Sequence, residues 1–171
     1  MISILAAALA TTFLLYNVIL PAAWEQYDQI GYQADADAES MLRYHQRAVD
    51  LVDADPASFS PGSELVTVDV RYPYTNLGIW RAQVVVADGN LGIVTAPADF
   101  GSSTTRSEAE YQAILTTLSR RNVVGIGSAL GTFPSSAPAT VGGITLTSIG
   151  TPIAPGAPTL VTRLAASPTA P

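Results

Sequence analysis

The chain has 171 residues, and its eight basic side chains against fourteen acidic ones leave a net charge of −6. All eight basic residues are arginines scattered along the sequence, so no basic patch forms and nucleic acid is a poor candidate partner. Cysteine is absent, which excludes disulfides, thiolate catalysis and cysteine-ligated zinc or iron–sulfur sites.

The N-terminal stretch is uncharged and apolar. Residues 1–20 contain no charged side chain, and the first charge in the chain is Glu25. Twenty residues at a helical rise of about 1.5 Å span roughly 30 Å, the thickness of a bilayer's hydrocarbon core. We therefore predict a transmembrane anchor over residues 1–22, with Pro21 breaking or kinking the helix.

A cleaved secretory signal is the alternative for this stretch. Against it, no Lys or Arg precedes the apolar run, and the Leu-Pro-Ala-Ala sequence at residues 20–23 matches a cleavage site only in part. The acidic residues that follow weakly favour an N-terminus in the cytoplasm and a folded domain on the other side of the membrane.

A polar and amphipathic helical segment with a loop is predicted for residues 23–60. Its best-patterned part runs from Glu39 to Val52, where apolar side chains recur at helical spacing on one face and charged side chains occupy the other. Such a helix must lie against another surface, and its apolar stripe is a candidate docking surface for a partner protein. The predicted docking residues are Met41, Leu42, His45, Val49 and Val52.

An α+β domain is predicted for residues 61–164, followed by a loose tail at 165–171. Alternating or valine-rich patterns predict strands, and Asp88-Gly89 is typical of a hairpin turn. Ser107 and Glu110 fit a capping box that starts a second helix. The predicted strands cover residues 66–70, 79–87, 91–95, 123–126, 144–149 and 159–164. The fold class is thus α+β: a single N-terminal transmembrane helix, an amphipathic helix, and an antiparallel sheet with one further helix.

The residues that could support catalysis or metal binding form no convincing site. His45 is the only histidine, and no Gly-x-Ser-x-Gly elbow is present, so we interpret it as a packing residue. The acidic cluster Asp35, Asp37 and Glu39 lacks the glycine turn and terminal glutamate of an EF-hand loop and is interpreted as a solvated helix start. The glycines at 125 and 127 lack the Gly-Lys-Ser/Thr of a phosphate loop. We predict no enzyme, no cofactor and no metal.

Several short motifs resemble one known family. They include the one-helix tether, Met41 to Val49 leading to Asp53-Ala54-Asp55-Pro56, Trp80 before a valine-rich hairpin, Leu118-Ser119-Arg120-Arg121 before Val124-Gly125-Ile126-Gly127, and Ile153-Ala154-Pro155-Gly156-Ala157. In these the chain is similar to the PilM proteins of type IVB and conjugative thin-pilus systems, which are distinct from the actin-like protein of the same name. More distantly, the order of elements resembles type IV pilins, although Leu5 stands where mature pilins have glutamate.

The resemblance implies an accessory protein of type IV pilus assembly. The expected location is the inner membrane, as a single-pass protein with a periplasmic C-terminal domain. Its expected partners are other pilus-assembly proteins, with self-association also compatible, and it would bind through the amphipathic stripe and an open sheet edge. Two alternatives stay open: a minor pilin or pseudopilin incorporated into the fibre, and a secreted ligand-binding or enzymatic domain with a cleaved signal.

Overall fold

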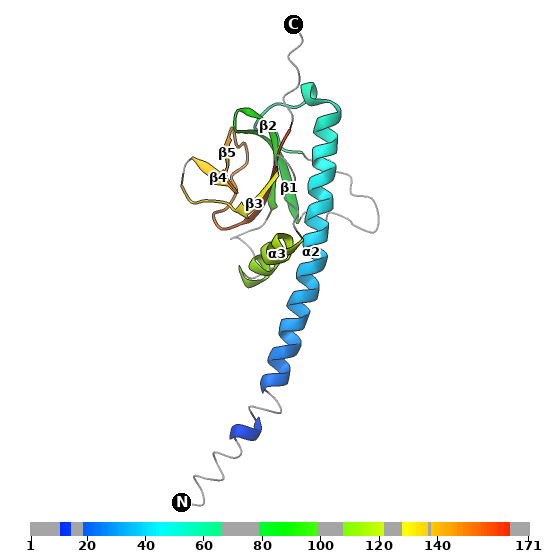
Figure 1. Ribbon diagram of the computed structural model, residues 1–171, viewed down its shortest axis with the longest axis vertical. Coiled ribbons are helices and arrows are strands. Elements are labelled where there is room, and N and C mark those ends of the chain that lie inside the picture. Colours follow the sequence, from blue (N-terminus) through cyan, green and yellow to red (C-terminus); the bar gives the residue numbers. More distant parts are fainter. Residues whose placement is uncertain are drawn as a thin grey trace, which may run out of the picture.

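The computed structural model describes residues 11–14, 19–65, 79–98, 108–121, 128–136 and 138–164. The folded domain contains two helices, six strands and one short 3₁₀ turn that follows the first helix, and a short helical turn at residues 11–14 lies apart from them (Figure 1). The elements are α2 (Leu20–Ala54), η2 (Pro56–Ser58), β1 (Trp80–Ala87), β2 (Asn90–Pro97), α3 (Glu108–Arg120), β3 (Ser128–Thr132), β4 (Ala139–Val141), β5 (Ile144–Thr147) and β6 (Pro158–Arg163).

The six strands form one antiparallel sheet in the order β3-β6-β2-β1-β5-β4. Strands β1 and β2 are joined by the predicted hairpin turn, in which Asp88 and Gly89 have φ of 48° and 81°. Positive φ at both central residues matches the right-handed twist of the two strands. The hairpin prediction is confirmed.

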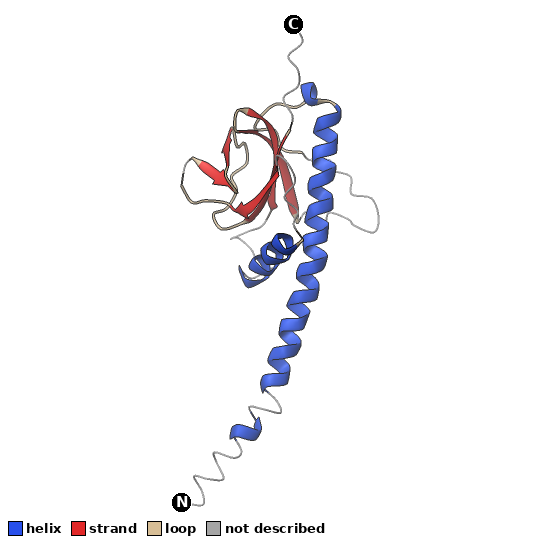
Figure 2. Ribbon diagram, viewed as in Figure 1, coloured by secondary structure: helices blue, strands red, loops and turns tan. Residues whose placement is uncertain are grey.

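The sheet has a hydrophobic core on each face. Trp80, Ala82 and Val84 of β1 point to the side covered by α2 and α3, whereas Val85 and Ala87 point the other way. This alternation follows from the two-residue period of a strand. Figure 2 shows the two helices lying on one side of the strand layer.

The sheet curls until its two edge strands approach each other. A Cβ built on Gly142, which follows β4, would lie 2.7 Å from the Cβ of Ala129 in β3, and one on Gly131 would lie 3.3 Å from Cγ1 of Val141. Curling encloses the second core between the strands. The edges therefore face each other in a near-barrel, so the sheet edge expected for docking is largely covered by this chain itself.

The prediction of a membrane-spanning helix is wrong for the part of the chain that the structure describes. The long helix α2 contains charged residues along most of its length, among them Asp35, Glu39 and Arg43. No helix in the described ranges is both long and apolar enough to cross a membrane, which corrects the fold class and the single-pass inner-membrane location. Residues 1–10 and 15–18, most of the predicted anchor, lie outside the described residues.

Most other predicted elements that fall on described residues are confirmed. Helices α2 and α3 and strands β1, β2, β5 and β6 lie where the patterns placed them. Strands β3 and β4 were not predicted, because their short runs of Ser, Ala, Gly and Thr have little hydrophobic pattern. The predicted strands at 66–70 and 123–126, the capping serine and the tail lie outside the described residues.

Candidate functional site

The predicted docking stripe lies against this domain's own sheet. Met41, His45 and Val52 are buried, and Leu42 and Val49 are half-buried against the same core. A partner protein cannot reach the three buried side chains unless α2 separates from the sheet. The stripe thus attaches the C-terminal part of α2 to the domain.

His45 is the polar centre of this attachment. Its Nδ1 lies 2.9 Å from Oγ1 of Thr95 in β2, and its Nε2 lies 2.7 Å from Oγ1 of Thr162 in β6. The Thr162 hydroxyl is also 2.9 Å from Oγ of Ser128 in β3. Burial lowers the pKa of His45 from 6.5 to about 4, so the ring is neutral at pH 7. Through these hydroxyls the ring joins the helix to three strands.

Ion pairs hold α3 against α2. Glu39 accepts hydrogen bonds from Arg43, 2.7 Å away on the same helix, and from Arg121 at the end of α3, 2.5 Å away. Arg121 also lies 3.8 Å from Asp35. The hydrogen bond from Arg43, followed by the charges of both arginines, holds the pKa of the Glu39 carboxyl below its usual value, although partial burial opposes the shift. Two members of the acidic cluster therefore neutralise arginines between the helices.

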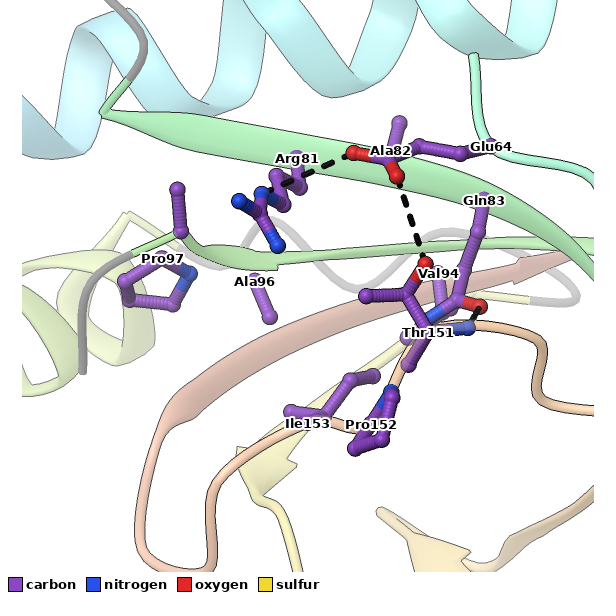
Figure 3. Close-up of a pocket in the computed structure, with 11 residues that line it drawn as sticks. Glu64, Arg81, Ala82, Gln83, Val94, Ala96, Pro97, Thr151, Pro152 and Ile153 are labelled. Atoms are coloured by element: carbon purple, nitrogen blue, oxygen red, sulfur yellow. Dashed lines mark hydrogen bonds and ion pairs between the residues drawn. The ribbon is translucent and has the colours of Figure 1, made fainter. Parts of the chain in front are cut away.

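A small cavity of about 20 Å³ lies beside the middle of β1, and Gln83 forms one wall of it (Figure 3). The buried Gln83 side chain donates to the carbonyl of Thr151 at 2.8 Å and accepts from the backbone N–H groups of Gly150 and Thr151, both at 3.0 Å. At the rim, Glu64 lies between Arg81, 3.5 Å away, and the Thr151 hydroxyl, 3.2 Å away. The cavity has room for about one water molecule. Its polar groups fix a loop and leave no space for a substrate.

Replacing Gln83 with leucine is expected to lower the free energy of unfolding by about 2 kcal/mol, since two N–H groups and one carbonyl lose their partner. Urea unfolding followed by circular dichroism measures the change. The matched control is Thr151→Val, which removes only an exposed bond to Glu64 and is expected to change stability by less than about 0.5 kcal/mol. Equal effects of the two substitutions would contradict the structural role given to Gln83.

The described residues contain no group of three or more histidine, aspartate or glutamate side chains placed to hold a metal ion. The lone histidine is engaged with threonines, and the clustered acids of α2 pair with arginines.

Comparisons with protein-family models, with curated proteins and with solved structures each found no match for this chain. The resemblance to PilM proteins therefore rests on the sequence motifs alone and stays a prediction.

The sequence interpretation missed Gln83, Thr95 and Thr162. Gln83 had a signal, because it is the one polar residue in the apolar run from Ala82 to Ala87. No sequence signal marked the two threonines, because threonine is common in strands. Their shared partner His45 is 50 residues from Thr95 and 117 residues from Thr162 in the chain.

Proposed function

We propose that this chain is a non-catalytic subunit of a type IV pilus assembly that acts by protein–protein contact. The observation that supports this most strongly is the shape of α2. The helix begins at Leu20, and among its residues 31–54 the first buried side chain is Ala34. Figure 1 shows the N-terminal part of the helix extending away from the sheet and past α3. We call residues 11–14 and 19–33 the stem.

The stem displays apolar side chains that have no place in this domain's cores. Phe13, Leu14, Ile19 and Tyr32 are exposed, and they make up four of the five exposed large hydrophobic residues among those described. Single helices of this length are marginal in water and gain most of their stability from packing. Apolar side chains gathered on one extension are typical of a surface that a partner covers.

The pilus assignment combines this geometry with the sequence resemblance. The motifs shared with PilM proteins favour an accessory protein that binds other assembly subunits. A second candidate, a minor subunit of the fibre itself, is favoured by the single long N-terminal helix that continues onto an antiparallel sheet, the order of elements that type IV pilins have.

The stem is expected to be required for assembly and dispensable for folding of the domain. A Leu14→Glu substitution places a charge on an exposed apolar position, so it is expected to reduce the number of pili per cell at least about tenfold while the protein level stays unchanged. Electron microscopy counts the pili, and immunoblotting measures the protein.

The matched control is Leu51→Glu, which makes the same exchange at an exposed leucine near the C-terminal end of α2 and is expected to leave piliation normal. Normal pili in the Leu14→Glu strain would refute the proposal. Shearing and purifying pili from unmodified cells then separates the two candidates, because a fibre subunit is recovered in the pili and an accessory protein is not.

A further inference from the structure

An apolar groove of about 770 Å³ opens at one end of the curled sheet. It lies between the loop that follows β3, which contains Phe133, and the segment that follows β5, which contains Ile149 and Ile153. These three side chains also pack against the second core. The groove is therefore the place where the core inside the near-barrel reaches the surface, and barrel mouths are frequent binding sites.

The groove has no charge. Every residue that lines it is apolar or carries at most a hydroxyl group, and Pro134, Ser136 and Pro138 are among them. A charged segment would lose its hydration there without finding a counter-charge, which disfavours binding. The lining thus selects an uncharged, apolar occupant.

This chain supplies such a segment. Residues 1–24 are uncharged in a protein with 22 charged side chains, and within them Phe13, Leu14 and Ile19 are exposed by 68%, 53% and 52%. Exposed aromatic and aliphatic side chains on a helix are the anchors that apolar grooves accept. Groove and segment match in both charge and hydrophobicity.

The two surfaces belong to different ends of the molecule. In Figure 1 the described residues 11–14 lie near the N-terminal tip, while β4 and β5 lie on the side of the domain away from α2. Because α2 continues outward from the domain, the contact is available between copies rather than within one chain.

We propose that the groove at Phe133, Ile149 and Ile153 accepts the uncharged segment around Phe13 and Leu14 of a second copy of this chain. This inference rests on the proposed function and names the partner of the stem. Each copy has one groove and one segment, so the contact is heterologous and repeats head-to-tail into rings or filaments.

The absence of cysteine allows a direct test. The full chain with Leu14→Cys and Ser136→Cys, both at exposed positions, is oxidised and separated on a non-reducing gel. A head-to-tail contact is expected to give a ladder of covalent oligomers, roughly tenfold more abundant than in the control pair Leu14→Cys with Ser119→Cys on the exposed face of α3. Circular dichroism verifies that each variant is folded.

Each other outcome has a definite meaning. Dimers from Leu14→Cys alone, without a ladder in the double variant, would show that two stems pair with each other; the groove proposal would be overturned and the proposed function would stand. Equal cross-linking in the test and control pairs would also overturn the groove. Normal pili in the Leu14→Glu strain would overturn the proposed function, which the gel does not measure.

Discussion

Acidification from pH 7 to pH 4 is expected to lower the free energy of unfolding by about 3 kcal/mol through His45 alone. Burial lowers the pKa of His45 from 6.5 to about 4 in the folded protein. Between these two values the unfolded chain binds a proton at His45 that the folded protein does not bind. The contribution of His45 to the free energy of unfolding is therefore complete above pH 6.5. It falls by about 1.4 kcal/mol per pH unit between pH 6.5 and 4, and it changes no further below pH 4.

Urea unfolding at several pH values between 7 and 4 measures this dependence. Because carboxylates titrate in the lower part of the same range, the curve has to be compared with that of His45→Gln, which keeps a polar side chain and has no titrating group. The wild-type curve is expected to fall more steeply, with the excess between pH 6.5 and 4. Parallel curves would show that His45 is not buried against Thr95 and Thr162.

Replacing Gly150 with alanine is expected to lower the free energy of unfolding by about 3 kcal/mol or more, at or beyond the usual range for overpacking. A Cβ at this position would lie 1.8 Å from the carbonyl oxygen of Gly62 and 2.7 Å from its carbonyl carbon. Neither loop can yield easily. The Gly62 N–H donates to the Val84 carbonyl at 2.7 Å, and the Gly150 N–H donates to the buried Gln83 side chain.

The control is Gly31→Ala, where a Cβ would meet nothing within 4 Å. Since Gly31 lies inside α2, alanine there is expected to raise stability by up to about 1 kcal/mol. Chemical unfolding midpoints of the two variants should move in opposite directions. A Gly150→Ala protein as stable as the wild type would mean that the loops at Gly62 and Gly150 are not in contact.

Local patterns in the sequence were sufficient for most of the secondary structure. The apolar stripe around Met41 and Val52 predicted an amphipathic helix, and Asp88-Gly89 predicted a hairpin, because both depend on neighbours within a few residues. The same reasoning assigned residues 1–22 to a membrane from length and hydrophobicity alone. Among the described residues, the long helix is α2, which begins at Leu20 and contains many charges.

Only the tertiary structure decided which contacts the apolar stripe and the buried polar residues make. Sequence spacing showed that Met41 and His45 share a face, and the fold alone placed that face on the domain's own sheet. Likewise, Gln83 and Gly150 are 67 residues apart, and their contact arises because a loop returns to β1. Hydrophobicity is a property of the sequence, but which apolar side chains stay uncovered, such as Leu14 and Ile19, depends on how the whole chain packs.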